Sequence, residues 1–472
     1  MAALAGMLKE HRFYVTGSDA AAYPPMSEFL AQLNIPVGQP FHERNLRPHP
    51  DLVIVGNAIS RGNPELEYVL DERIPFQSMP HMLHEEFLAG EEPIVVAGTH
   101  GKTTTTSMLS WLFHAAGRDP SFLIGGIAEN FGSSFSLGTG RQFILEGDEY
   151  DTAFFDKGPK FLHYFPDAAI LTSVEFDHGD IYRDLDAVKT SFKRLVNLVP
   201  RRGRMIAWDG GDGALKDNLD DCLARAFCPI ERYGFREDSY WRIAGVRYEG
   251  ERTSWSVLRM GKPWAEFEFG LTGEYNVLNA TAAAAMAAAY DITPVQIAHA
   301  LAEFRSVKRR LEVCAEIAGI TVIDDFAHHP TAIDATLKAL RTRYPGRRLW
   351  VLLEPRSNTL ARNLLQDDLA RSLRLADQVV IADVYRASRY SDAERLDIEA
   401  VIALLRQSGC VARHLADADA IVSSIVPELR AGDVIAIMSN GAFGGIYEKL
   451  PAALEKERSR SGSTFGDHYT GS

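Results

Sequence analysis

The clearest chemical signal in this sequence lies in the run VVAGTHGKTTTTSM. Glycines without Cβ atoms let backbone amides converge on phosphate oxygens, so Gly98 and Gly101 suit a phosphate-binding loop. Lys102 adds a positive charge for the terminal phosphates, and the hydroxyl of Thr103 suits Mg²⁺ at a helix N-terminus. The pattern GxxGKT, between a strand and a helix, predicts an ATP site, although Val96 replaces the first glycine of the full motif. A chance turn is disfavoured, because both flanking elements are well formed.

Two acidic segments follow the phosphate loop, and each comes directly after an apolar run. The run 143–145 leads to EGDEYD, which starts at Glu146, and the run 169–171 leads to EFDH, which ends at His178. Carboxylate oxygens suit Mg²⁺, and an imidazole is tolerable as an additional ligand. For either residue alone, a helix cap or a solvated charge is the better explanation. Two such clusters downstream of a phosphate loop favour a metal site.

Three later segments add polar side chains next to predicted elements. The segment LTGEYNVLNATAAAA places Asn279 before an alanine-rich helix, where an amide reads a purine edge or, more simply, caps the helix. The segment IDDFAHHP offers Asp325 and His329 to a substrate or a metal, with a buried structural histidine as the alternative. Arg356, in EPRSNT, has the planar geometry to clamp a carboxylate. An ordinary loop arginine explains that motif equally well.

These residues need a scaffold that brings strand ends together. Short apolar runs alternate with amphipathic stretches, which predicts parallel, doubly wound sheets with ligands at the carboxyl ends of strands. The predicted strands are 13–15, 52–55, 94–97, 143–145, 169–171, 321–323, 349–353, 378–381 and 434–438. The predicted helices include 26–33, 64–70, 280–289 and 294–304.

The 472 residues are enough for about three α/β domains. A polar break at 89–93 and a second boundary near Lys308 divide the chain into domains at 1–90, 91–307 and 308–454. Residues 455–472 are rich in Ser, Gly and charge, which predicts a disordered tail.

The composition narrows the class of protein. Apolar residues make up 46% of the chain and the net charge is −13, which fits an acidic globular protein and argues against nucleic acid or anionic lipid as partners. The four cysteines form no CxxC pair, which is typical of reduced thiols. No run approaches the roughly 20 apolar residues of a membrane span, and no signal peptide is evident. We therefore expect a cytoplasmic enzyme.

Taken in order, GTHGKTTT, EGDEYD, EFDH, GEYNVLNA, KRRLE and DDFAHHPT resemble the Mur ligase family, which builds cell-wall peptides by ATP-driven amide formation. The resemblance runs from Val15 to about Leu450. It implies a Rossmann-like UDP-binding domain, a central P-loop ATPase domain and a Rossmann-like C-terminal domain that closes over the amino substrate. TGSDAAAYPPMS, EPRSNT and MSNGAFGGI are most similar to the branch that acts in peptidoglycan recycling. That branch joins UDP-N-acetylmuramate to the tripeptide L-alanyl-γ-D-glutamyl-meso-diaminopimelate.

The resemblance also implies a mechanism and its residues. The muramate carboxylate attacks the γ-phosphate of ATP, and the tripeptide amine attacks the resulting acyl phosphate. The implied catalytic residues are Lys102, His178, Arg310 and His329, and the implied Mg²⁺ ligands are Thr103, Glu146 and His178. The implied nucleotide-binding residues are Gly98, Thr99, Gly101, Lys102, Thr103, Thr104, Asn279, Arg310 and Asp325. The implied substrate-binding residues are Asp19, Asn57 and Ser134 for the UDP-sugar, and Arg356 and Asn358 for the peptide.

The sequence departs from the family pattern at several positions. It starts after the strand and glycine-rich loop that grip the UDP diphosphate, so we expect a misassigned start codon or a truncated chain, with weaker UDP-sugar binding. Gly147, Ser173 and Tyr275 replace an alanine, an asparagine and a histidine. Several members of the family use a carbamylated lysine on the helix after the histidine ligand. Lys193 lies on such a helix, but its basic neighbours favour a solvated face.

Two other functions stay open on sequence grounds. One is a related ligase that adds L-alanine alone or belongs to the folylpolyglutamate type. The other is a nucleotide-binding regulator that has lost catalysis, which the departures from the pattern allow. We expect a monomer or a weak homo-oligomer.

Overall fold

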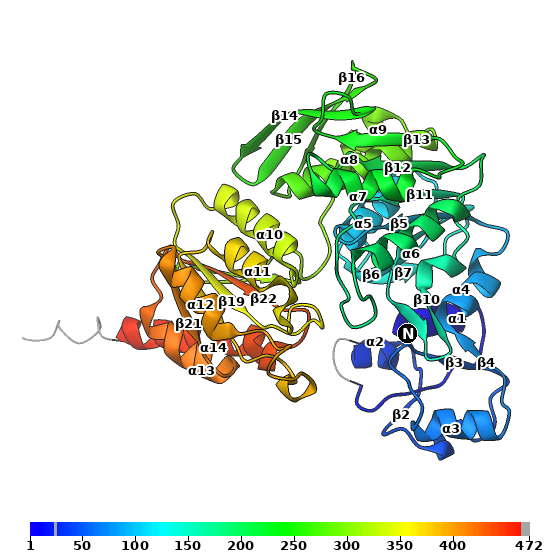
Figure 1. The fold of residues 1–472 in the computed structure, drawn as a ribbon, viewed down its shortest axis with the longest axis horizontal. Coiled ribbons are helices and arrows are strands. Elements are labelled where there is room, and N and C mark those ends of the chain that lie inside the picture. The colour runs from blue at the N-terminus through cyan, green and yellow to red at the C-terminus, as the bar shows by residue number, and fades with distance from the viewer. Residues whose placement is uncertain (23–25, 464–472) are drawn as a thin grey trace, which may run out of the picture.

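The computed structural model describes residues 1–22 and 26–463, which form three α/β domains (Figure 1). The N-terminal and central domains are stacked on one another, and the C-terminal domain lies to one side of them. The predicted boundaries near residues 90 and 307 fall in connections between elements. Within the described residues, no helix is long and apolar enough to cross a membrane.

The central domain is built on a sheet of ten strands in the order β16-β15-β14-β13-β12-β11-β5-β8-β6-β7. The strands from β6 to β14 in this order are parallel, and antiparallel strands extend both edges. The strands are β5 (Glu92–Ala97), β6 (Ser121–Ala128), β7 (Ser133–Ser136), β8 (Gln142–Gly147), β11 (Ala168–Leu171), β12 (Arg204–Trp208), β13 (Ile230–Gly234), β14 (Trp241–Glu249), β15 (Arg252–Arg259) and β16 (Lys262–Phe269). A small hairpin, β9 (Asp151–Ala153) and β10 (Asp156–Pro159), follows β8.

Helices cover both faces of this sheet. On β5, Ile94 and Val96 face one apolar core, and Val95 and Ala97 face the other, as the two-residue period of a strand requires. The first core takes the helices α5 (Lys102–Ala115), α8 (Glu274–Ala289) and α9 (Pro294–Ala302). The second takes α6 (Leu185–Leu198) and α7 (Ala214–Leu223), and also α1 (Ala2–Glu10) and α4 (Met79–Leu83) from the N-terminal domain. The N-terminal domain is therefore anchored on the central core.

The N-terminal domain differs from the single doubly wound sheet that we predicted. Its described strands form two separate parallel pairs, β1 (Gly17–Ser18) with β2 (Val37–Gly38), and β3 (Val53–Val55) with β4 (Phe76–Ser78). The predicted strand at 13–15 is wrong: these residues have no regular structure, and the side chains of Phe13 and Tyr14 are exposed. Of the three residues, Val15 alone packs against an apolar core, so the segment has no continuous buried face. The predicted helices are present as α2 (Met26–Gln32) and α3 (Pro64–Asp71).

The C-terminal domain has a six-stranded sheet in the order β17-β18-β22-β19-β20-β21, in which only the edge strand β17 is antiparallel. The strands are β17 (Glu312–Ile317), β18 (Ile320–Asp325), β19 (Leu349–Leu353), β20 (Gln378–Ile381), β21 (Val411–His414) and β22 (Val434–Met438). Its helices are α10 (Pro330–Arg343), α11 (Gln366–Leu373), α12 (Ile398–Gln407), α13 (Ala418–Ile425) and α14 (Ile446–Ser463). The predicted strands of this domain are all present.

The C-terminal segment departs from its prediction. We predicted that residues 455–472 are a disordered tail, but α14 continues to Ser463. The helix is anchored near its start by buried Ile446, Leu450 and Leu454, and the next two turns propagate from that packed part. Residues 464–472 lie outside the described part of the chain.

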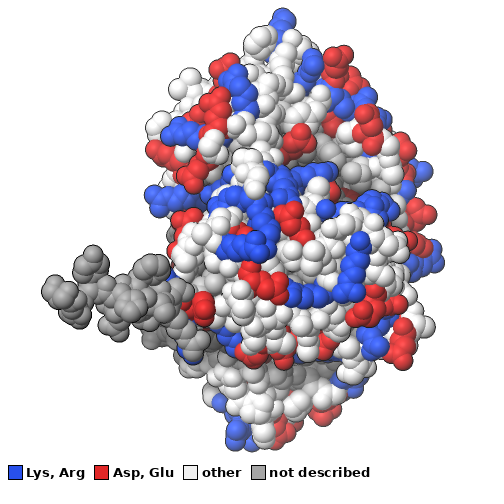
Figure 2. Space-filling view, turned by 90° about the vertical axis from the view of Figure 1, so that its left-hand side faces the viewer, with Lys and Arg blue, Asp and Glu red and all other residues white. Residues whose placement is uncertain are grey.

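Charges of both signs are mixed on the surface. On the face drawn in Figure 2, Lys and Arg side chains gather in a band across the middle, with Asp and Glu side chains next to them. This face of the molecule therefore does not carry a single sign of charge.

Candidate active site

The phosphate loop joins β5 to α5, and its two glycines are required by close contacts. Gly98 has φ +132°, and a Cβ atom there would lie 2.2 Å from Oγ1 of Thr172. Gly101 has φ +82°, and a Cβ atom there would lie 2.5 Å from Oδ1 of Asn279. Asn279 therefore lies directly against the loop, and its predicted contact with the nucleotide stays a prediction. Its buried Nδ2 has no hydrogen-bond partner among the described residues, so a donor is free for a nucleotide.

The phosphate loop is hydrogen-bonded to the segment that follows β11. The backbone N–H groups of Thr99 and His100 donate to O and Oγ of Ser173, at 2.9 and 3.0 Å. The backbone N–H of Glu175 donates to Oγ1 of Thr99, at 2.9 Å. Ser173, one of the departures from the family pattern, thus supports the backbone of the phosphate loop through its hydroxyl.

Lys102 is nearly buried and bound within the site. Its Nζ donates to the carbonyl of Gly98 at 2.7 Å and lies 2.9 Å from Oε2 of Glu149. Burial alone lowers the pKa of this lysine, but the nearby carboxylates of Glu149, Asp148 and Glu146 raise it above its usual value. These carboxylates therefore favour the cationic form of Lys102. Sequence reasoning included Glu149 in the acidic cluster without giving it a role.

The predicted metal ligands lie beside this lysine. Oγ1 of Thr103 donates to Oε1 of Glu146 at 3.1 Å, and the N–H of Gly125 donates to the other carboxylate oxygen at 2.9 Å. Burial is the main cause that raises the pKa of Glu146. Nε2 of His178 lies 3.2 Å from Oε1 of Glu149, the carboxylate that also binds Lys102. These contacts join Thr103 to Glu146, and Lys102 to His178 through Glu149.

A hydroxyl, several carboxylates and an imidazole suit Mg²⁺. One ligand atom from each of Asp148, Glu149 and His178 lies within 4.8 Å of the others. Buried carboxylates next to a phosphate loop are the donors that Mg²⁺ takes together with phosphate oxygens. The residues present therefore fit the ion that the family resemblance implies.

The loop that carries His178 is docked onto the C-terminal domain. Oγ1 of Thr359 donates to Oδ1 of Asp177 at 2.6 Å, and the same carboxylate oxygen accepts the backbone N–H of His178 at 2.7 Å. His178 has φ +54°, a left-handed conformation that is uncommon outside glycine. Further contacts across the domains join Arg362 to the carbonyl of Gly179, at 3.0 Å, and Asn358 to Asp180, at 2.8 Å.

A pocket of about 270 Å³ opens where the two domains meet. The central domain contributes Tyr150, Asp177 and His178, and the C-terminal domain contributes His328, Arg356, Ser357, Asn358, Thr359, Tyr385, Arg386, Arg389, Tyr390 and Asn440. The guanidinium of Arg356 lies 3.8 Å from the centroid of the Tyr385 ring, and its Nη1 lies 3.6 Å from Oε1 of Glu354. The predicted peptide-binding residues Arg356 and Asn358 therefore share a pocket with His178.

Three predicted residues of the C-terminal domain lie elsewhere. The carboxylate of Asp325 accepts the N–H groups of Leu311 and Ala327, at 2.8 and 2.9 Å, which holds the start of the domain in place. Arg310 lies 5.1 Å from the centroid of the Phe326 ring. His329 caps α10 and does not line the pocket, although we predicted it near the incoming peptide.

His329 packs instead against the phosphate loop. Its ring lies 4.8 Å from that of His100, and its Nε2 lies 3.2 Å from the carbonyl of Phe176. Burial, together with the neighbouring His100, lowers the pKa of His329 to about 4. The ring is therefore neutral at physiological pH.

The predicted UDP-sugar residues are spread over the N-terminal side of the molecule. Asp19 and Asn57 are exposed, and Ser134 lies half-buried on β7. Oδ1 of Asp19 accepts the N–H of Ala21 at 3.1 Å, as an acid in a turn does. None of these residues hydrogen-bonds to the phosphate loop in the described part of the chain, so their role stays a prediction.

The other departures have local explanations. A Cβ atom at Gly147 would lie 2.6 Å from Cγ1 of Val95, so the position is crowded. The ring of Tyr275 packs against the apolar core of the C-terminal domain. Nζ of Lys193 lies 2.7 Å from Oδ1 of Asp221, in a partly exposed ion pair, as expected for a solvated helix face.

Sequence comparison identifies three family domains in the expected order. The model described as "Mur ligase family, catalytic domain" matches residues 1–89, "Mur ligase middle domain" matches residues 96–287, and "Mur ligase, glutamate ligase domain" matches residues 309–441.

Two curated relatives extend the match over nearly the whole chain. The UDP-N-acetylmuramate--L-alanyl-gamma-D-glutamyl-meso-2,6-diaminoheptandioate ligase of Escherichia coli (strain K12) is 42% identical over 97% of this chain and 96% of its own length. The UDP-N-acetylmuramate--L-alanine ligase of Psychrobacter sp. (strain PRwf-1) is 33% identical over 96% of this chain and 92% of its own.

Two solved structures have the same overall fold as this chain. A murein peptide ligase from Psychrobacter arcticus superposes with a TM-score of 0.72, at 38% identity and 96% coverage of both chains. A UDP-N-acetylmuramate-alanine ligase from Thermotoga maritima has a TM-score of 0.77 at 22% identity, with 98% of this chain and 97% of that chain covered, which bears on the fold alone.

Proposed function

Because the chain belongs to the Mur ligase family, and is therefore an ATP-dependent amide ligase, we propose that it joins UDP-N-acetylmuramate to L-alanyl-γ-D-glutamyl-meso-diaminopimelate. The peptidoglycan recycling role follows from these substrates. The 42% identical relative carries both substrates in its name.

The observation that carries this choice is the cationic pocket between the domains. Arg356, Arg386 and Arg389 all line it, next to three tyrosines. The tripeptide has three free carboxylates, one on the glutamyl residue and two on diaminopimelate, and guanidinium groups bind carboxylates in a bidentate manner. L-Alanine has one carboxylate and is much smaller than a pocket of about 270 Å³. The pocket therefore suits the tripeptide better than the single amino acid.

The chemistry follows from the positions of the residues around the phosphate loop. The lactyl carboxylate of the sugar nucleotide attacks the γ-phosphorus, ADP leaves, and an acyl phosphate forms. The tripeptide amine then attacks the acyl carbon, loses a proton and displaces phosphate. Lys102 neutralises the transferring phosphoryl group, and the loop amides hold it. Catalysis of this kind depends on position and charge more than on a nucleophilic side chain.

One Mg²⁺ would be held by Thr103 and Glu146 and a second by His178, where they would neutralise phosphate charge. Glu149 orients both Lys102 and His178. Asp19, Asn57 and Ser134 remain our candidates for the UDP-sugar. The oligomeric state, a monomer or a weak homo-oligomer, and the cytoplasmic location also remain predictions.

ADP release distinguishes the possible functions. The enzyme is assayed with ATP, Mg²⁺ and UDP-N-acetylmuramate, and with either the tripeptide or L-alanine, and the products are identified by mass. We expect kcat/KM for the tripeptide to exceed that for L-alanine by at least about a hundredfold, because two further charged contacts are made. A preference for L-alanine would favour the alanine-adding relative. No ADP release with either substrate would favour a regulator without catalysis.

A further inference from the structure

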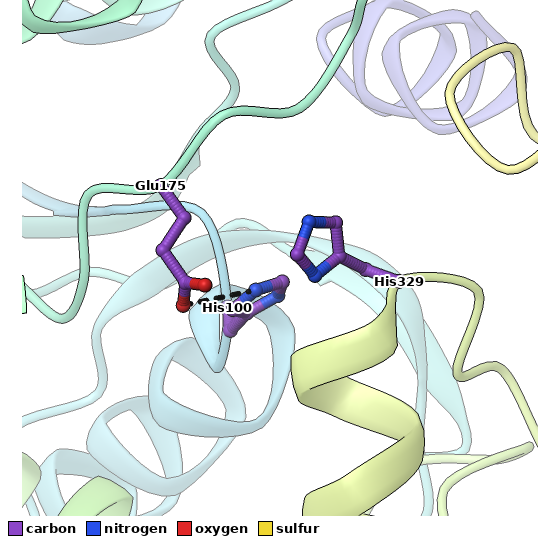
Figure 3. A group of neighbouring side chains, drawn as sticks. All are labelled: His100, Glu175 and His329. Carbon is purple, nitrogen blue, oxygen red and sulfur yellow. Dashed lines mark ion pairs between the residues drawn. The ribbon is translucent and has the colours of Figure 1, made fainter. Parts of the chain in front are cut away.

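A second cluster of potential metal ligands lies beside the phosphate loop and shares no residue with the predicted Mg²⁺ ligands. Figure 3 shows His100, Glu175 and His329 facing one another, each from a different segment. One ligand atom from each lies within 4.8 Å of the others. His100 belongs to the phosphate loop, Glu175 follows β11, and His329 caps α10 of the C-terminal domain. We propose that these three residues bind a transition-metal ion such as Zn²⁺, which clasps the C-terminal domain to the phosphate loop and slows turnover.

The spacing of the first two ligands already suits a tetrahedral ion. Zinc bonds of about 2.0 Å in a tetrahedral site place neighbouring ligand atoms about 3.3 Å apart. Nε2 of His100 lies 3.3 Å from Oε1 of Glu175. His329 completes the set if it approaches by up to about 1.5 Å from its present separation. A fourth position then stays open to water.

The partners of the ligands favour coordination. Metal-bound histidines donate their second ring N–H to a carbonyl, and Nε2 of His329 lies 3.2 Å from the carbonyl of Phe176. This bond leaves Nδ1 unprotonated, and only the weak cap contact from the N–H of Thr331, at 3.3 Å, has to be given up. The hydroxyl of Thr331 donates to Oε2 of Glu175 at 2.7 Å, which orients the carboxylate so that Oε1 faces Nε2 of His100.

Two further features support a metal at this place. Nε2 of His100 is buried and has no hydrogen-bond partner with good geometry among the described residues. The side chains of His100 and Glu175 are only 22% and 15% exposed, so an ion held between them would be shielded from bulk water. One carboxylate with two imidazoles is a donor set of zinc sites, whereas Mg²⁺ prefers oxygen ligands.

The consequence concerns movement between the domains. The ligands come from the nucleotide side and the peptide side of the cleft, so one ion bridges both domains. A ligase that closes over its substrates must open again to release products. An ion bound at this clasp opposes opening without touching the pocket of Arg356. Zinc would therefore act as an inhibitor from a site distinct from the Mg²⁺ site.

The binding test uses the metal-free full chain without nucleotide or substrates, so it does not depend on the identity of the amino substrate. Zn²⁺ is titrated by calorimetry, and Co²⁺ is followed by its visible absorption. We expect His329→Asn and Glu175→Gln each to weaken binding at least about tenfold. Asparagine keeps the helix cap, and thermal unfolding checks that both variants are folded.

The matched control is His178→Asn in the oxygen-rich cluster. This variant should keep the Co²⁺ spectrum of the clasp, and excess Mg²⁺ should leave that spectrum unchanged. Loss of the signal only in His178→Asn, or its displacement by Mg²⁺, would assign the ion to the Mg²⁺ site and overturn the proposal. Wild-type affinity in both clasp variants would overturn it as well.

A kinetic measurement tests the inhibitory role. In excess Mg²⁺, Zn²⁺ should slow ADP release by the wild type, and a zinc-selective chelator should restore it. His329→Asn should need about tenfold more Zn²⁺ for the same fractional inhibition. Equal sensitivity of the two enzymes would show that zinc acts elsewhere and would remove the regulatory part of the proposal.

Discussion

The phosphate loop and the pocket between the domains are held in different ways. Lys102 and Glu149 are only 13% and 2% exposed, and all their bonding partners lie in the central domain. In the pocket, Arg386 and Arg389 are exposed, and the walls come from two domains. The contacts that hold Lys102 in the phosphate loop therefore lie within one domain, whereas recognition of the amino substrate depends on domain closure. If the two regions are separate in this way, substitutions in one region should leave the kinetic parameters of the other unchanged.

Replacement of the loop lysine should have the largest effect. Lys102→Met removes the cation that neutralises the transferring phosphoryl group, so kcat should fall at least about a hundredfold with any amino substrate. ADP release with tripeptide and with L-alanine measures this. If the variant lost activity with only one of the two substrates, the nucleotide side would not be independent of the peptide side.

Truncation of the pocket arginine should act on the peptide alone. Arg356→Ala removes a charged hydrogen-bond donor worth about 1.5–3 kcal/mol, so KM for the tripeptide should rise about ten- to hundredfold. KM for ATP should stay unchanged, and Arg356→Lys should recover only part of the loss because it lacks the planar fork. An equal rise in KM for ATP would show that the pocket and the phosphate loop do not act independently.

The hydroxyl that joins the two regions should have a moderate effect. Thr359→Val removes the 2.6 Å bond to Asp177, the residue before His178. At about 1 kcal/mol for one hydrogen bond, kcat should fall roughly fivefold, with KM for ATP unchanged. Thr359→Ser, which keeps the hydroxyl, should restore kcat. A defect that serine does not repair would point to packing and not to this bond.

The smallest effect is expected on the face of α6 that lies toward solvent. Lys193 pairs with Asp221 and is 40% exposed. Lys193→Met should leave kcat unchanged and should alter the free energy of unfolding by less than about 1 kcal/mol. Bicarbonate-dependent activity in the wild type that is missing in this variant would instead support a carbamylated lysine.

The proximity of the residues predicted for the nucleotide could be anticipated from the sequence because they follow strands, whereas their role stays a prediction. Lys102, Thr103 and Glu146 come at the ends of predicted strands or at the start of a predicted helix, and parallel strands place such ends at one edge of the sheet. Glu149 was missed as the partner of Lys102. The signal was present, since it stands three residues beyond Glu146 in the same acidic run.

The peptide side was harder to predict. Thr359, Tyr385, Arg386 and Arg389 join His178 in one pocket although roughly 200 residues separate them from it along the chain. Only the mutual placement of two domains brings them together, and neither periodicity nor a motif encodes that placement. The same limit explains why His329, predicted near the peptide, lies at the clasp with His100.

The bond between Lys102 and Glu149 has a consequence for how a triphosphate enters. The ammonium group of Lys102 already pairs with the carboxylate of Glu149 and donates to two backbone carbonyl oxygens. Phosphate oxygens that bind Lys102 therefore replace the carboxylate of Glu149 as its counter-ion. The positive charge of Lys102 is paired both before and after the nucleotide binds. Affinity for nucleotide should accordingly vary only weakly with ionic strength, and the displaced carboxylate becomes available to the cation that travels with the nucleotide.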